Sequence, residues 1–389
     1  MYTNFSSPHS RNRSPLPACL THRPEAHLSE TKRHTIGVLR GEGIGPEVVD
    51  AALTVLRAVE PLINVTFDVK VGGPIGREAM ESAGAALSSE VTTFCKEIFA
   101  VDGAILAGAG GGRFVYDMRQ EFDLFCKISP IVTWPELQSA GRLKPPFTAN
   151  VDICLVRDNS AGVYQGTWSA GEDSLQGRTA SQSFSYDEAQ VTRILRIAAA
   201  IAQSRNQELT VVTKPGGVPT ISELWSACAQ TIGRESGISI QELEIDNAAF
   251  QLVHAPQQFD VMVSPNLFGD ILSDVAGVVL GSRGLCYGAS YSPTGAAVYQ
   301  TNHGAAHDLT GTNTANPVGQ ICSLAMMLRE SFGLCSAANL IDAAVVDTWR
   351  QGYRTKDLKE DGCQVLSSQA MSQQIANAVT RLVESGATL

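Results

Sequence analysis

The sequence of 389 residues lacks several features that define large classes of protein. It has no apolar run of about 18 residues, so we expect no helix that crosses a membrane. Acidic residues (39) outnumber lysines and arginines (29), and the resulting net charge of −10 argues against nucleic-acid binding through a basic surface. The nine cysteines are scattered and form no C-x-x-C pair, which indicates reduced thiols in a cytoplasmic protein.

Residues 1–34 also lack the pattern of a folded segment. They are rich in Ser, Pro, His and Arg, show no apolar periodicity and contain no apolar core of a secretory signal. We predict a disordered N-terminal extension. A targeting peptide is the alternative, and the acidic residues Glu25 and Glu30 argue against it.

The dinucleotide-binding fingerprint G-x-G-x-x-G is missing as well. A strand is predicted at 35–39, followed by Gly41-Glu-Gly-Ile-Gly-Pro-Glu47 and an amphipathic helix. Pro46 occupies the place of the third glycine, so the sequence does not predict a Rossmann fold. A second glycine run, 108–112, follows a strand predicted at 100–106. It is consistent either with nucleotide binding or with close approach of the backbone.

Strand and helix patterns alternate along most of the chain. Predicted strands lie at 151–156, 209–213, 238–244 and 259–263, and predicted helices at 113–124, 187–204, 221–234, 247–254, 318–332, 336–350 and 368–385. This alternation predicts an α/β protein with a largely parallel sheet. Segment 158–185 instead alternates polar and apolar residues with glycines, which is typical of an antiparallel hairpin arm that pairs with a partner subunit.

Two aspartates, Asp270 and Asp274, stand four residues apart where a helix is predicted to open after the strand at 259–263. This spacing places both carboxylates on one helical face, where they repel each other unless a cation lies between them. Hard divalent ions with oxygen ligands, Mg²⁺ or Mn²⁺, fit such a pair. The alternative is a solvated helix face whose N-terminal aspartate is stabilised by the helix dipole.

Seven stretches in one order resemble the β-decarboxylating dehydrogenase family, which includes isopropylmalate, isocitrate, homoisocitrate and tartrate dehydrogenases. The stretches are 41–47, 119–125, 156–166, Lys214, 246–252, 266–274, and 303–308 with 315–317. The resemblance covers nearly all of residues 35–389. It implies a two-domain α/β fold that is not a Rossmann fold.

The resemblance also implies how the domains divide. The first, cofactor-side domain would comprise 35–124 and 283–389, and the second would comprise 125–282, with a dimer arm at about 158–185. The active site would lie in the cleft between them. A homodimer is implied, in which each active site takes residues from both subunits.

The family reaction oxidises a 2-hydroxy acid with NAD(P)⁺ and then releases CO₂. By resemblance, Lys214 is the base that takes the hydroxyl proton, with a pKa lowered by nearby cations, and Tyr164 is the acid that protonates the product carbon. Asp270 and Asp274, together with Asp246 from the other subunit, match the family's ligands for Mg²⁺ or Mn²⁺. A surface lysine and an interface tyrosine are the alternatives for the two catalytic residues.

The substrate-binding positions depart from the family. Arg119 and Arg157 match two of the family's three carboxylate-binding arginines, but Ser129 replaces the third. Lys127 lies two residues earlier, on the same face of an extended chain, and could partly replace the missing charge. Arg113 stands where isocitrate dehydrogenases have a serine. It predicts an anionic, phosphonate-like substituent unless it points to solvent.

The cofactor positions favour NAD. The loop that wraps adenosine in this family begins at His303, Gly304 and Ala305, and Asn316 would face adenine. Asp308 matches the acidic residue of NAD-using members, where a carboxylate accepts hydrogen bonds from a free ribose hydroxyl and repels a 2′-phosphate.

We therefore predict NAD-dependent, divalent-metal-dependent oxidative decarboxylation of a 3-substituted malate whose substituent is polar or anionic. An isopropylmalate or tartrate/malate-type dehydrogenase is the first alternative. A non-catalytic regulatory subunit of an isocitrate dehydrogenase-like complex is the second. The joint presence of Tyr164, Lys214 and all three aspartates argues against the second.

Overall fold

The computed structural model describes residues 32–173 and 177–386. Most of the extension predicted at 1–34 therefore lies outside the described residues. The fold begins slightly earlier than predicted, because the first strand already starts at Lys32. No helix in these two ranges is long and apolar enough to cross a membrane.

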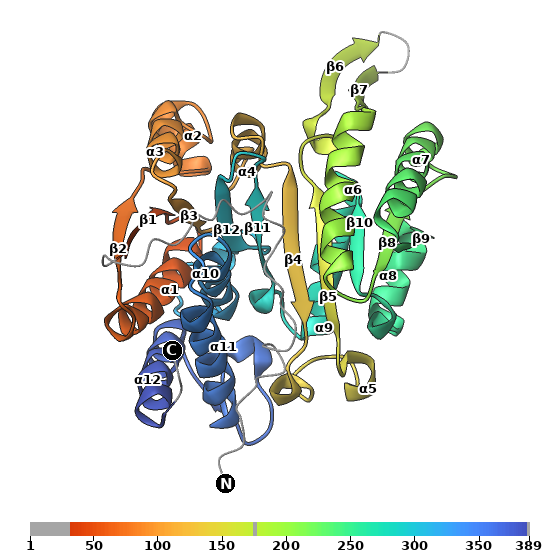
Figure 1. The fold of residues 1–389 in the computed structure, drawn as a ribbon. Coiled ribbons are helices and arrows are strands. Elements are labelled where there is room, and N and C mark those ends of the chain that lie inside the picture. Colours follow the sequence, from red (N-terminus) through yellow and green to blue (C-terminus); the bar gives the residue numbers. More distant parts are fainter. Residues whose placement is uncertain (1–31, 174–176, 387–389) are drawn as a thin grey trace.

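One ten-stranded sheet runs through the molecule (Figure 1) in the order β2-β1-β3-β12-β11-β4-β5-β10-β8-β9. Its strands are β1 (Lys32–Leu39), β2 (Val65–Val71), β3 (Ala104–Ala107), β4 (Cys126–Val132), β5 (Asp152–Asp158), β8 (Glu208–Thr213), β9 (Ser239–Glu244), β10 (Val261–Ser264), β11 (Tyr287–Tyr291) and β12 (Ala297–Thr301). Neighbouring strands are parallel except around β11 and β4, which pair antiparallel with each other and with β12 and β5. The expected largely parallel α/β sheet is confirmed.

The strand order separates the sheet into two halves along the sequence. The half from β2 to β11 is built from strands before residue 108 and after residue 286, and the half from β4 to β9 from strands between 126 and 264. This grouping follows the domain boundaries expected from the resemblance, but the division into two domains stays a prediction.

Helices cover the sheet, and most follow the predicted pattern. They are α1 (Gly45–Val59), α2 (Arg77–Ala83), α3 (Ser89–Phe99), α4 (Phe114–Glu121), α5 (Pro145–Thr148), α6 (Glu188–Gln203), α7 (Pro219–Ser236), α8 (Ile245–His254), α9 (Asn266–Leu280), α10 (Val318–Glu330), α11 (Cys335–Arg350) and α12 (Ser368–Glu384). Every residue of α10 is buried. This central helix packs between β12 and the helices α1 and α11, so it is apolar around most of its circumference.

The predicted hairpin arm is present as a separate sheet. Strands β6 (Thr167–Asp173) and β7 (Gly177–Ser183) pair antiparallel and project from the body of the molecule (Figure 1). Trp168 on β6 is 58% exposed, which is unusual for so large an apolar side chain. The pairing of this arm with a second subunit stays a prediction.

Candidate active site

The carboxylate of Asp270 is the centre of the candidate site. Strand β10 leads directly into α9, which carries Asp270 just after its first turn. Gly269 allows this helix to lie against β5, because a Cβ at that position would be 2.7 Å from Cβ of Arg157. Oδ1 of Asp270 accepts a hydrogen bond from Nη1 of Arg157 at 2.5 Å. The helix predicted to open after the strand at 259–263 is confirmed.

The guanidinium of Arg157 is fixed on its other side by Asn266. Nε and Nη2 of Arg157 both donate to Oδ1 of Asn266, at 3.1 and 2.7 Å, and the Asn266 amide donates to the carbonyl of Ala161. Arg157 is only 3% exposed, so this fork-shaped contact orients a buried charge. Sequence reasoning did not assign Asn266 to the site, although it stands in the same motif as Asp270.

Two further cations, Arg119 and Lys127, are buried beside Arg157. Burial and the charge of Arg157 lower the pKa of Arg119 to about 9. Burial, with the charges of Arg119 and Arg157, holds the pKa of Lys127 well below its ordinary value. Nη1 of Arg119 has no hydrogen-bond partner among the described residues. Three cations around one carboxylate make a site that an anion would stabilise.

Tyr164 completes this cluster from the 3₁₀ turn Val163–Gln165 at the base of the arm. Its hydroxyl donates to Oδ2 of Asp270 at 2.8 Å. Burial, followed by the hydrogen bond to Asp270 and its charge, raises the pKa of Tyr164 above the ordinary value. The phenol therefore keeps its proton at neutral pH, as an acid must before it acts.

Ser129 and Lys127 lie on one face of β4, as expected from their spacing. Lys127 pairs with Arg157 across the antiparallel ladder, and Ser129 pairs with Leu155. Both β4 residues are buried. The structure therefore places Lys127 beside the two arginines, although burial and their charges lower its pKa and disfavour its protonated form. The replacement of the missing arginine charge by Lys127 stays a prediction.

Arg113 lies at the start of α4 and contacts the arm. Its guanidinium lies 4.7 Å from the ring centre of Trp168 and 5.3 Å from that of Tyr116. Its Nη2 donates to the backbone carbonyl of Tyr164 at 3.4 Å, and its Nε lies 3.4 Å from Asp117. Arg113 thus borders the cluster, with its charge partly compensated and its side chain held between aromatic rings.

Asp274 lies one turn after Asp270 on α9 and is paired with Arg283 at 2.9 Å. Each aspartate is therefore balanced by an arginine in the isolated chain. No group of three or more His, Cys, Asp or Glu side chains that could hold a metal occurs in the described parts. Two carboxylates suit the hard-oxygen preference of Mg²⁺ or Mn²⁺, so the residues fit such an ion but supply an incomplete set of ligands.

Lys214 and Asp246 lie apart from this cluster and contact each other. Nζ of Lys214 is 2.6 Å from Oδ1 of Asp246 and 2.6 Å from Oε2 of Glu244. The hydrogen bonds to Asp246 and Glu244 raise the pKa of Lys214. The expected lowering of this pKa is therefore wrong for the single chain, because two carboxylates and not cations surround the amine. Sequence reasoning also missed Glu244.

The predicted cofactor residues lie on the loop between β12 and α10. Nε2 of His303 is buried and has no partner in the described part of the chain, and burial lowers the pKa of His303. Asn316 is buried and donates to Asp357 at 3.0 Å. Gly304 is exposed, and Asp308 is exposed in the 3₁₀ turn His307–Leu309. The charges of Arg283 and Asp274 affect the pKa of His303, so this loop adjoins the end of the cluster that carries Asp274.

The glycine-rich loop 41–47 supports this cofactor loop. The backbone N–H of Ile44 donates to the carbonyl of Ala305 at 2.8 Å. A Cβ on Gly43 would collide with that same carbonyl, and Gly43 also has a positive φ of 64°. Close approach of two backbones therefore explains this glycine without any bound nucleotide.

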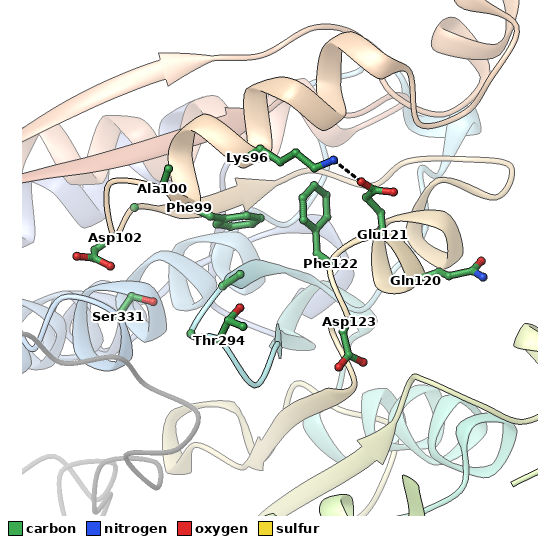
Figure 2. A pocket seen from close by; sticks show the side chains of 13 residues that line it. Lys96, Phe99, Ala100, Asp102, Gln120, Glu121, Phe122, Asp123, Thr294 and Ser331 are labelled. Atoms are coloured by element: carbon green, nitrogen blue, oxygen red, sulfur yellow. Dashed lines mark ion pairs between the residues drawn. The ribbon is translucent and has the colours of Figure 1, made fainter. Parts of the chain in front are cut away.

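A separate cavity of about 510 Å³ lies at the C-terminal end of α4 (Figure 2). An ion pair between Lys96 and Glu121, 2.6 Å long, crosses from α3 to α4 at its edge. None of the residues predicted for catalysis, metal, substrate or cofactor lines this cavity. This cavity is therefore separate from the residues predicted for the active site.

Comparison with known proteins agrees with this arrangement. Residues 35–379 match the family described as isocitrate/isopropylmalate dehydrogenase. The 3-isopropylmalate dehydrogenases of Geobacillus kaustophilus and Aquifex aeolicus are each 36% identical to this chain. The first alignment covers 89% of this chain and 95% of the relative, and the second covers 90% and 98%.

Solved structures show the same similarity. The isocitrate dehydrogenase of Methylococcus capsulatus superposes with a TM-score of 0.78 at 29% identity, covering 89% of this chain and 99% of its own. The apo β-decarboxylating dehydrogenase of Thermococcus kodakarensis gives 0.69 at 28% identity, covering 90% and 97%. This chain therefore belongs to the isocitrate/isopropylmalate dehydrogenase family and is an oxidoreductase of the β-decarboxylating type.

Proposed function

We propose that this protein uses NAD⁺ and a divalent cation to oxidise and decarboxylate a 3-substituted malate with a polar or anionic substituent. The observation that carries the proposal is the gathering of Arg119, Lys127 and Arg157 around Asp270. Buried cations in excess of carboxylates suit a substrate with several carboxylates. The narrower form of this proposal is that the substituent is anionic, for example a phosphonate. The positive charge of Arg113 at the border of the cluster supports this narrower form.

Asp270 and Asp274, with Asp246 of the partner subunit, would hold Mg²⁺ or Mn²⁺. When bound, such an ion polarises the substrate hydroxyl and stabilises the negative charge that develops on the oxygen. The residues that would hold NAD⁺, which would supply the hydride acceptor, are His303, Gly304, Ala305, Asp308 and Asn316. Asp308 is exposed, so its carboxylate is free to receive the ribose hydroxyls.

Residues of the protein would orient the substrate and transfer the protons. Arg119 and Arg157 orient the substrate carboxylates, which fixes the reacting atoms next to Asp270. Lys214 of the partner subunit would take the hydroxyl proton, and Tyr164 would deliver its phenolic proton to the carbon that loses CO₂. Nζ of Lys214 donates hydrogen bonds to Glu244 and Asp246, which favour its protonated form. These hydrogen bonds must break, or the two carboxylates must also contact other groups of the site, before Lys214 is basic enough to act.

A homodimer with shared active sites fits the surface near the arm. Gly162, Val163, Trp225 and Phe268 are among the residues lining an apolar pocket of about 100 Å³ at the base of the arm. This pocket and the exposed Trp168 offer apolar surface that a second copy would cover. A cytoplasmic location suits the described cysteines, none of which forms a disulfide in these ranges.

Isopropylmalate is the second candidate substrate, because the relatives reported above carry that name. The direct test is NAD⁺ reduction with Mg²⁺ or Mn²⁺ on malate, tartrate, isocitrate, 3-isopropylmalate and 3-(phosphonomethyl)malate. Turnover of a polar or anionic member above 3-isopropylmalate supports the proposal. A preference for 3-isopropylmalate contradicts it, and absence of turnover with ligand-induced stabilisation intact identifies a regulatory subunit.

A further inference from the structure

Trp168 lies near the base of the arm, and its indole lies against Arg113 at the border of the candidate site. The guanidinium carbon of Arg113 is 4.7 Å from the ring centre of Trp168. This is within the distance of about 6 Å at which an aromatic face attracts a cation. Trp168 remains 58% exposed, so burial in a core does not explain why a tryptophan stands at this position.

The guanidinium of Arg113 is held only weakly by polar groups. Arg113 is the N-cap residue of α4, and its side chain makes no capping hydrogen bond. Its polar contacts to Asp117 and to the carbonyl of Tyr164 are both 3.4 Å long, beyond the usual range of about 2.7–3.2 Å. We therefore expect the rings of Trp168 and Tyr116 to contribute most to the position of this charge.

The hairpin of the arm determines which way the indole faces. The hydroxyls of Thr167 and Ser169 on β6 pair with those of Ser183 and Ser181 on β7, at 2.9 and 2.8 Å. Because successive side chains of a strand point to opposite faces, Trp168 lies on the other face of the arm. That face therefore carries the contact with α4.

The contact with Trp168 leaves part of the guanidinium available to a ligand. A guanidinium over an aromatic face keeps its N–H donors for other partners. No described residue accepts a hydrogen bond from Nη1 of Arg113, and 41% of the Arg113 side chain is exposed. An anionic group could therefore reach Nη1 while the indole stays in place.

Arg113 also lies next to the residue proposed as the acid. Its Nη2 donates to the carbonyl of Tyr164, and the ring centres of Tyr116 and Tyr164 are 5.2 Å apart. Tyr164 in turn donates to Asp270. A substrate oriented at Asp270 would therefore have its substituent close to Arg113, and the position of the guanidinium would affect which substituents bind.

We propose that Trp168 is a positioning residue for substrate specificity, whose indole holds the guanidinium of Arg113 where it binds an anionic substituent of the substrate. This inference rests on the proposed dehydrogenase function and deepens it. Trp168 acts through Arg113 and touches no reacting atom. Without the ring face, the guanidinium turns toward Asp117 or solvent, and the affinity for a charged substituent falls while that for an apolar one does not.

Matched substrates measure this effect in the intact protein. The anionic substrate is isocitrate or 3-(phosphonomethyl)malate, whichever the unaltered protein turns over faster. The neutral one is 3-isobutylmalate, which has the shape of isocitrate with two methyl groups in place of the carboxylate oxygens. We define the anion preference as the ratio of kcat/KM for the anionic substrate to kcat/KM for the neutral one, and we expect it to exceed one.

Two variants of Trp168 separate the ring face from general packing. Trp168→Leu keeps an apolar side chain and removes the ring. It should lower the anion preference by about tenfold or more, mainly through KM of the anionic substrate, and change kcat/KM for 3-isobutylmalate by less than about threefold. Trp168→Phe keeps a ring face, so its anion preference should stay within about threefold of that of the unaltered protein.

A double variant tests whether Trp168 acts through Arg113. Arg113→Met removes the charge and should lower the anion preference at least as much as Trp168→Leu. Adding Trp168→Leu to Arg113→Met should lower it no further, because only independent effects multiply. Phe147→Leu is the control, because Phe147 is a partly exposed aromatic residue on α5, at the opposite end of the molecule from the arm (Figure 1). It should leave the anion preference unchanged.

The outcomes separate the two proposals. The role of Trp168 is overturned, with the dehydrogenase function left standing, if Trp168→Leu leaves the anion preference unchanged or lowers turnover of both substrates equally. It is also overturned if Trp168→Phe loses as much preference as Trp168→Leu, if the double variant loses more than Arg113→Met, or if the unaltered protein has an anion preference of one or less. No turnover of any of the three substrates contradicts the proposed function, and the role of Trp168 falls with it.

Discussion

Tyr164 donates a hydrogen bond to Asp270 at 2.8 Å although 106 positions separate the two residues in the sequence. The contact joins the base of the arm to the N-terminal part of α9. It places a protonated phenol directly beside the carboxylate proposed to hold the metal ion. One hydrogen bond therefore joins the residue proposed as the acid to a residue proposed as a metal ligand.

Tyr164→Phe should remove the proton donor and leave substrate binding largely intact. We expect kcat to fall by about 10²- to 10⁴-fold with little change in KM, the range typical of general acid catalysis. Since burial and Asp270 raise the pKa of Tyr164 above its ordinary value of 10.0, the acid form is present throughout the pH range below 10. Steady-state kinetics measure kcat and KM, and Tyr353→Phe, which lies outside the candidate site, is the control. A loss of less than about threefold removes Tyr164 from catalysis.

Lys214→Ala should abolish turnover without changing the oligomeric state. Lys214 is partly exposed and its ion pairs lie near the surface, so its loss should leave thermal unfolding nearly unchanged. Turnover, thermal unfolding and light scattering measure the three properties. Substantial remaining activity would contradict the assignment of Lys214 as the base.

Glu244→Gln tests how the pKa of Lys214 controls its proposed role as the base. The hydrogen bonds from Asp246 and Glu244 favour the protonated amine and raise its pKa, so removing one carboxylate lowers it. A base acts in its deprotonated form, and the acidic limb of kcat/KM against pH should therefore move to lower pH. A limb that stays in place, or moves to higher pH, would show that Lys214 does not determine it.

Asp274→Asn should weaken metal binding without weakening the fold. The Asp274–Arg283 pair is about half-exposed, so its loss should cost under about 1 kcal/mol. The Mn²⁺ concentration for half-maximal activity should rise by about tenfold or more, because a neutral amide is a poorer ligand for a hard cation. Asp50→Asn, which breaks the similarly exposed Arg40–Asp50 pair, should leave metal dependence unchanged. Equal effects of both variants would remove Asp274 from the metal site.

Asp308→Ala should relax the cofactor preference. The carboxylate is exposed on the loop after β12, where it would repel a 2′-phosphate and accept hydrogen bonds from a free ribose hydroxyl. We expect the ratio of kcat/KM for NAD⁺ over NADP⁺ to fall by about tenfold or more. Equal use of both cofactors by the unaltered protein would already contradict this role.

Local patterns in the sequence were sufficient to predict most of the elements. The apolar run before residue 264 and the helix from residue 266 follow from periodicity, because each element buries one face and its spacing is visible in the chain. The spacing of Lys127 and Ser129 likewise placed them on one face of a strand. The family's residues then identified Arg119, Arg157 and Tyr164, whose contacts the structure shows.

Long-range contacts were decided only by the tertiary structure. Asn266 orients Arg157, Glu244 raises the pKa of Lys214, and Asn302 bonds to Ser129, and each pair is separated by many residues. No periodicity encodes such pairs, since they depend on which strands become neighbours in the sheet. Sequence therefore determined the elements and the kind of chemistry. Packing determined which charged and hydrogen-bonding groups meet in the candidate site.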